Sequence, residues 1–139
     1  MKKLLVLLFS ILISFNSYAN WELLVEDNTA DGYIDIETIK EHNYYVYFWI
    51  LQNKHSPDEF PGMSVKVYGQ GDCKIDRMRS LNLTAYKEQM GEGEIEAEFT
   101  PDNPEWEFMA PDSLGGFYLN YVCNYVNFRR FVCLYYGEV

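Results

Sequence analysis

Residues Tyr44–Leu51 read YYVYFWIL and form the clearest β-strand in the sequence. The run is almost continuously aromatic, β-branched or aliphatic, which is typical of a central strand covered on both faces. The sequence therefore predicts a sheet built around this strand. Its aromatic side chains, from Tyr44 to Trp49, could also line a groove for a peptide or a sugar, although such strands more often supply a core.

The residues before this strand predict two shorter strands. Residues 21–25 (WELLV) form the first, residues 26–32 make a polar turn, and residues 33–36 re-enter the sheet. The carboxylate of Asp35 can accept hydrogen bonds from free backbone N–H groups, so we expect it to cap a single helical turn over residues 37–40.

The residues after the central strand predict three more strands. Residues 63–68 alternate between apolar and polar, and residues 69–72 should make a tight turn. A long strand is expected over residues 73–86, with a bulge near residues 77–80 that repairs its imperfect alternation. Residues 94–99 (EIEAEF) alternate strictly and indicate an edge strand protected by its glutamates.

The C-terminal part of the domain predicts a helix. Residues 100–111 hold three prolines and should be irregular, after which Ser113 can act as the N-cap of a helix reaching Tyr125. Gly115 and Gly116 weaken this helix, so it must depend on packing against the sheet. The predicted fold class is α+β: an antiparallel sheet of about five or six strands with one C-terminal helix packed on it.

The first nineteen residues predict export. Lys2 and Lys3 precede an apolar run from Leu4 to Phe15, and Ser17-Tyr18-Ala19 supplies small residues for a cut before Asn20. The run is shorter than the roughly 20 residues that a membrane-spanning helix needs. We therefore expect a signal peptide at 1–19, no transmembrane segment after cleavage, and a periplasmic, cell-surface or extracellular location.

The composition of the mature chain indicates a packed, acidic protein. Hydrophobic residues make up 48% and aromatic residues 17% of the sequence, which excludes an acidic disordered chain. Removing Lys2 and Lys3 leaves nine basic residues against 21 acidic ones, for a net charge of −12. This charge disfavours nucleic acid as a partner, and it also serves solubility.

The three cysteines predict one disulfide in an oxidising compartment. A bond between Cys73 and Cys123 would close a long loop and could contribute about 4 kcal/mol of stability, leaving Cys133 unpaired. The alternative bond between Cys73 and Cys133 remains open.

An ordered set of landmarks runs along the mature chain. In chain order they are Trp21, Tyr33-Ile34-Asp35, Ile39-Lys40, Phe48–Leu51, Ser64–Tyr68, Asp72-Cys73, Arg79, Leu81, Tyr86, Met90-Gly91, Gly93, Trp106, Pro111–Ser113 and Val122–Asn124. This order resembles the surface-adhesin protein E-like family of small exported bacterial proteins, over Trp21 to about Tyr125.

The resemblance implies an antiparallel sheet with a C-terminal helix, a disulfide joining Cys73 in the sheet to Cys123 in the helix, no enzyme activity, and adhesion. The domain would then cover residues 20–126. Two features depart from the family: the basic residues near one another are only Lys74, Arg77 and Arg79, and a tail over residues 127–139 runs past the point where the family should stop.

A second motif imitates a calcium-binding loop. The residues from Asp27 through Asp31 to Asp35 place oxygen ligands and a turn glycine at the spacing of an EF-hand. The twelfth position should be a bidentate glutamate but is Thr38, and the segment before the loop is strand-like. A polar turn is the favoured interpretation, and a weak Ca²⁺ or other divalent-cation site is the alternative function.

Other chemistry-bearing residues do not form a recognisable catalytic group. His42 and His55 both fall in polar turns, and the best-placed cysteines are expected to be bonded. In the tail, residues 131–136 (FVCLYY) either form an exposed apolar patch for a partner or add a strand to the sheet. The sequence thus predicts an exported, non-enzymatic binding module with no cofactor and an unidentified protein or envelope partner.

Overall fold

The computed structural model describes residues 20–137, so the expected signal peptide lies outside the described residues. The elements in chain order are β1 (Trp21–Glu26), β2 (Ala30–His42), β3 (Tyr45–Lys54), β4 (Ser64–Asp72), β5 (Arg77–Tyr86), the 3-10 turn η1 (Gln89–Gly91), β6 (Ile95–Phe99), β7 (Glu107–Phe108) and α2 (Leu114–Tyr136).

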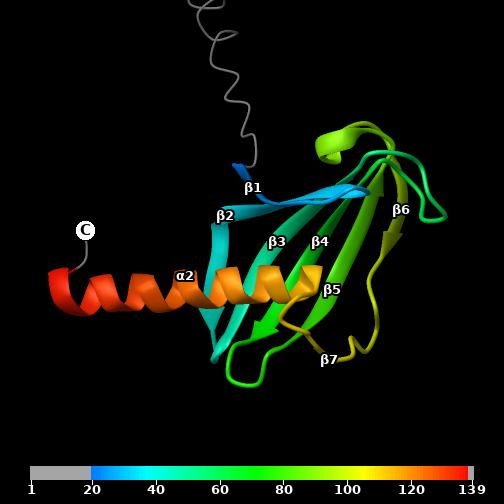
Figure 1. The fold of residues 1–139 in the computed structure, drawn as a ribbon. Helices are drawn as coiled ribbons and strands as arrows, with labels where there is room; N and C mark the ends of the chain where they lie inside the picture. Colours follow the sequence, from blue (N-terminus) through cyan, green and yellow to red (C-terminus); the bar gives the residue numbers. More distant parts are fainter. Residues whose placement is uncertain (1–19, 138–139) are drawn as a thin grey trace, which may run out of the picture.

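The strands form one antiparallel sheet in which β1 to β6 follow chain order and β7 pairs with β5. Helix α2 crosses one face of this sheet, and its C-terminal half projects beyond the sheet on the β2 side (Figure 1). The predicted α+β class is confirmed, as is the charged edge strand near residues 94–99. The short strand β7 was not predicted, because two residues carry no alternation to detect.

Strand β3 lies between β2 and β4 and divides the molecule into two faces. Val46, Phe48 and Ile50 point toward α2 and are buried, as successive residues of a strand alternate in direction. Tyr45, Tyr47 and Trp49 point the other way and are only half-buried. Coverage on both faces, expected along the whole strand, therefore holds only toward its C-terminal end, where Leu51 and Asn53 on this second face are also buried.

The helical turn expected at residues 37–40 is wrong, because these residues remain in β2. The register between β2 and β3 shifts between Asp35 and Lys40, which marks a bulge. Thr38 holds the bulge to β3: its hydroxyl donates to the Asp35 carbonyl (2.8 Å) and accepts from the Trp49 N–H (3.3 Å). Asp35 does accept a bond from the Glu37 N–H (3.2 Å), but inside the bulge rather than at a helix start.

The tight turn expected at residues 69–72 is also wrong, since these residues complete β4 and the chain turns at residues 73–76. The core packs closely onto this strand: a Cβ at Gly69 would lie 3.1 Å from the Phe48 ring, which is tighter than an ordinary van der Waals contact. The register between β4 and β5 shifts opposite Leu81, one position beyond the predicted bulge.

Helix α2 begins as predicted and ends later than predicted. The Ser113 hydroxyl accepts a hydrogen bond from the Gly116 N–H (3.1 Å), which confirms the N-cap. The helix continues past Tyr125 to Tyr136, so a strand formed by residues 131–136 is wrong. No helix within residues 20–137 is both long and apolar enough to cross a membrane.

The disulfide joins Cys73, in the turn after β4, to Cys123 on α2, as predicted. The two Cα atoms lie 5.7 Å apart, and the bond attaches the helix to the sheet at the far end of β4. Val122, directly beside Cys123, is fully buried. The bond therefore fixes α2 where its apolar side already packs on the core.

Candidate binding surfaces

The face of the sheet opposite α2 carries aromatic side chains and two arginines. We call it the aromatic–arginine face. Its members are Tyr45, Tyr47, Trp49, Tyr68, Gln70, Arg77, Arg79 and Trp106. They share this face because Tyr47 pairs with Gln70 and Trp49 with Tyr68 across β3 and β4, and Gln70 pairs with Arg79 across β4 and β5.

Trp106 is the centre of this face. It comes from the irregular segment before β7 and lies over the two arginines of β5, with the ring centroid 4.5 Å from the guanidinium carbon of Arg77 and 4.4 Å from that of Arg79. Its ring also lies 5.3 Å from the ring of Tyr45. Contacts of this kind are favourable cation–π interactions, and they hold both guanidinium groups in place.

A hydrogen-bond chain orients the neighbouring polar groups. The Gln70 amide donates to the Tyr47 hydroxyl (2.7 Å), and its carbonyl oxygen accepts from Arg79 Nε (2.6 Å). Arg77 bonds to the Asp72 carboxylate (3.2 Å). Because Gln70 is buried while the rings and guanidinium groups around it are half-buried, the face presents pre-oriented donors beside stacked aromatic rings.

The turn η1 closes one end of the same face. The Met90 N–H donates to the Asn53 side-chain oxygen (2.7 Å), and the Gly91 N–H donates to the Ser64 hydroxyl (2.9 Å). The open part of the face therefore runs from Trp49 toward Trp106.

A cavity of about 620 Å³ lies on the other face, between the sheet and the first turns of α2. Its floor includes Ile50, Val67 and Leu83, and its mouth includes Lys54 and Asp58. Tyr118 lines it from α2, and burial raises the pKa of the Tyr118 hydroxyl. That hydroxyl is the one buried side-chain polar atom within residues 20–137 that has no hydrogen-bond partner.

The residues of the calcium-like motif do not converge. The Asp27 carboxylate accepts bonds from the Thr29 hydroxyl and from the N–H groups of Thr29 and Ala30, and these bonds lower its pKa to about 2. Asp31 binds His55 (2.9 Å), whereas Asp35 is buried in β2. In the described part of the chain, no three His, Cys, Asp or Glu side chains lie where they could hold a metal ion.

The predicted basic cluster is divided between two places. Arg77 and Arg79 belong to the aromatic–arginine face, whereas Lys74 lies in the turn between β4 and β5, with its ammonium 4.6 Å from the Tyr44 ring centroid. Trp106 is the important residue that sequence reasoning did not assign to a site. The sequence feature that could have indicated it is a large aromatic residue in a Pro-rich segment outside any predicted strand or helix.

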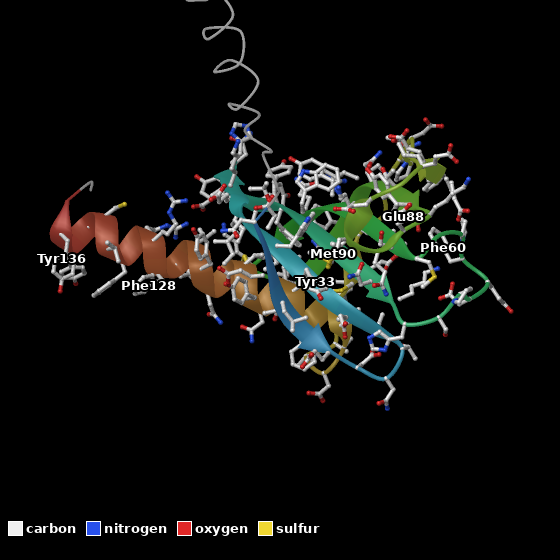
Figure 2. All side chains as sticks on the ribbon, turned by 90° about the horizontal axis from the view of Figure 1, so that it is seen from above. Tyr33, Phe60, Glu88, Met90, Phe128 and Tyr136 are labelled. Atoms are coloured by element: carbon white, nitrogen blue, oxygen red, sulfur yellow. A yellow bond between two sulfur atoms is a disulfide. The ribbon has the colours of Figure 1, made fainter. Side chains whose placement is uncertain are left out.

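The last turns of α2 expose the apolar side chains of the tail. Cys133 is exposed and unpaired among the described residues. The exposed aromatic and aliphatic residues nearby are Phe128, Phe131, Leu134, Tyr135 and Tyr136. Figure 2 shows Phe128 and Tyr136 on the part of the helix that extends away from the sheet. Of the two structures predicted for residues 131–136, the exposed apolar patch is therefore the correct one.

Comparison with known proteins gives one family and one fold. A family model described as surface-adhesin protein E matches residues 21–124. No curated protein matches the chain. The crystal form II structure of Haemophilus influenzae protein E is similar with a TM-score of 0.59 and 20% identity, over 78% of this chain and 91% of that chain.

Two further solved structures show the same fold. The selenomethionine form of Haemophilus influenzae protein E has a TM-score of 0.51 and 21% identity, over 86% of this chain and 90% of that chain. Protein E from non-typeable Haemophilus influenzae has a TM-score of 0.51 and 20% identity, over 83% of this chain and 82% of that chain.

Proposed function

Because this chain belongs to the surface-adhesin protein E family, we propose that it is an exported, non-enzymatic surface protein that binds a host or envelope partner through its aromatic–arginine face. The family supports an adhesin-like role. The identity of the binding face rests on one observation, the contact of Trp106 with both Arg77 and Arg79.

This contact supports binding because it lies outside the core of the protein. The core of the protein lies on the other face, where β3 packs against α2. A tryptophan between two arginines contributes little to that core, yet Trp, Tyr and Arg are the residue types that carry most binding energy at protein interfaces. The Gln70 chain further reduces the entropy that the Arg79 and Tyr47 side chains would lose on binding.

The charge of the molecule fits a local binding face. The mature chain carries a net charge of −12, which repels acidic partners at long range. Arg77 and Arg79 offset this charge at one place, and Asp72 partly neutralises Arg77. We therefore propose that the partner surface combines apolar or aromatic groups with a few acceptors, rather than a dense polyanion.

Adhesion of coated beads tests this proposal. Beads carrying residues 20–139 should attach to epithelial monolayers and to an immobilised extracellular-matrix preparation. Trp106→Ala should reduce attachment at least tenfold, since losing one central aromatic anchor costs about 2 kcal/mol or more. Arg79→Gln should reduce attachment to a smaller extent.

The matched control is Phe117→Ala, which removes an exposed aromatic ring from α2 on the other side of the molecule. Attachment that falls equally with Phe117→Ala, or that survives Trp106→Ala in a folded protein, would refute this choice of face. Circular dichroism and the melting temperature of each variant establish that it is folded.

We also propose the division of the chain predicted from the sequence, with cleavage before Asn20, a domain over residues 20–126 and a C-terminal extension over residues 127–139. Intact-mass analysis of the protein from its native envelope tests the cleavage. A chain that begins at Asn20 supports export through the general secretion route. A chain that retains Met1 contradicts the proposed location and with it the adhesin role.

A further inference from the structure

The cavity lies on the helix side of the sheet and shares only Arg79 with the aromatic–arginine face of the proposed adhesion. Its floor is a row of apolar neighbours across three strands: Ile50 of β3 pairs with Val67 of β4, and Val67 pairs with Leu83 of β5. Helix α2 covers only part of this row, since it crosses the sheet obliquely and then leaves it (Figure 1). Within the row, Ile50 and Val67 are buried and Leu83 is half-buried, so the row forms an apolar inner wall of the cavity.

The walls of the cavity can adjust their shape. Met78 of β5 and Met109 before α2 both line it, and methionine is the apolar side chain that adapts most easily to irregular space. A Cβ at Gly115 would lie 2.3 Å from the sulfur of Met109, so the absence of a side chain at Gly115 leaves room for that methionine. Such walls suit a flexible ligand better than a rigid one.

The mouth of the cavity carries a buried cation. The Lys54 ammonium donates to the Asp58 carboxylate (2.5 Å) and to the Phe60 carbonyl (2.5 Å), and the Lys54 side chain is only 8% exposed. An ammonium has three N–H donors, so one remains for a ligand. Figure 2 places Phe60 at the end of the molecule opposite Tyr136, away from the exposed end of α2.

We propose that this cavity binds the apolar chain of a linear amphiphile, with the acceptor oxygens of its head group at Lys54. The volume of about 620 Å³ lies within the range of ordinary ligand sites, roughly 300–1,000 Å³. The apolar floor would contact the acyl chain, and the methionine walls would adapt to its different conformations. Lys54 would bind the head group and so fix its position. A free fatty acid and the acyl chain of a lipid share this chemistry.

Isothermal titration with a homologous series tests the proposal. Octanoate, decanoate and dodecanoate, each below its micelle concentration, are titrated into the protein of residues 20–139. Affinity should rise roughly tenfold for every two methylenes added, because each buried methylene contributes a similar increment. Affinity that does not depend on chain length overturns the proposal.

Variants in the cavity locate the site. Leu83→Trp and Met109→Trp each place a large ring in the cavity, from half-buried positions on different elements, and should weaken dodecanoate binding at least tenfold. Phe117→Trp, on the exposed side of α2, adds the same ring elsewhere and should leave binding unchanged. If both cavity variants fold and bind normally, the amphiphile binds elsewhere and the proposal is wrong.

The head group distinguishes the two sources of the chain. Lys54→Gln should weaken dodecanoate binding several-fold, because the free donor of a cation is replaced by a neutral amide. If a lysophospholipid of the same chain length binds more tightly than dodecanoate, the natural ligand is a membrane lipid. The reverse order indicates a free fatty acid. Failure of both ligands to bind overturns the site without affecting the proposed adhesion, which depends on Trp106, a residue outside the cavity.

Discussion

Leu119 of α2 occupies the space where a side chain at position 71 would point: a Cβ at Gly71 would lie 2.6 Å from Cδ1 of Leu119. Leu119 is almost fully buried, and Gly71 lies within β4. Helix α2 approaches β4 closely at this point because the strand position has no side chain. A glycine in a strand interior is otherwise unfavourable, so the contact explains why it stands there.

Gly71→Ala should therefore destabilise the protein by about 1–3 kcal/mol, the usual cost of overpacking a core. Unfolding in guanidinium chloride measures this change as a lower denaturant midpoint with an unchanged m-value. In the background of Leu119→Ala, which removes the side chain that clashes, the same substitution should cost much less. Equal cost in both backgrounds would show that the Gly71–Leu119 contact does not limit the helix position.

The disulfide should be a major source of stability. Cys73 and Cys123 are 50 residues apart, and closing a loop of that length restricts the unfolded chain by about 4 kcal/mol in the chain-entropy estimate. In a Cys133→Ser background, which prevents exchange with the free thiol, reduction should shift the denaturant midpoint downward by a corresponding amount. If reduction leaves the denaturant midpoint unchanged, the disulfide does not stabilise the fold, and packing alone holds α2 on the sheet.

The sequence allowed a reliable prediction of elements whose signal is local. The alternation of residues 94–99 and the cap at Ser113 each depend on neighbours within a few residues, and both are confirmed. Residues 37–40 and 69–72 were misassigned for the opposite reason. Thr38 stays in β2 because its hydroxyl bonds to the N–H of Trp49, which is distant in the sequence. Gly69 and Gly71 belong to β4 because distant core side chains, Phe48 and Leu119, pack directly onto them.

The candidate site was even less visible in the sequence. Trp106 reaches Arg77 and Arg79 only because β7 returns to pair with β5 after an irregular segment. Nothing local to Trp106 indicates that return. The tail was uncertain for a similar reason, because residues 131–136 suit a strand by propensity but continue a helix that has already begun.

The contact between His55 and Asp31 predicts a pH-dependent property of the β1–β2 turn region. The Asp31 carboxylate lies 2.9 Å from His55 Nε2, and this hydrogen bond raises the pKa of His55 above its usual 6.5. Since the folded state holds the proton more tightly, the contact stabilises the fold fully below pH 6.5 and loses its effect as pH rises through the folded pKa.

Asp31→Asn should lower the pKa of His55 toward its ordinary value, which a proton NMR titration of the imidazole resonances measures. Glu37→Gln, also on β2 but away from His55, serves as the control and should leave the titration unchanged. An unaltered His55 curve in Asp31→Asn would show that the 2.9 Å contact does not persist in solution.

The buried hydroxyl of Tyr118 predicts a substitution in the core that does not destabilise the protein. It has no hydrogen-bond partner among the described residues, and it faces Gly32, where a Cβ would lie 2.3 Å from the hydroxyl oxygen. A buried hydroxyl without a partner costs about 1–3 kcal/mol, whereas the ring itself packs well in the core. Tyr118→Phe should therefore leave the free energy of unfolding unchanged or raise it by about 1 kcal/mol.

Tyr118→Leu is the matched control, because it removes the ring as well as the hydroxyl and should destabilise the protein by a few kcal/mol. The two variants together separate packing from hydrogen bonding, with thermal and denaturant unfolding as the measurements. A clear loss of stability in Tyr118→Phe would mean that the hydroxyl does bond in solution.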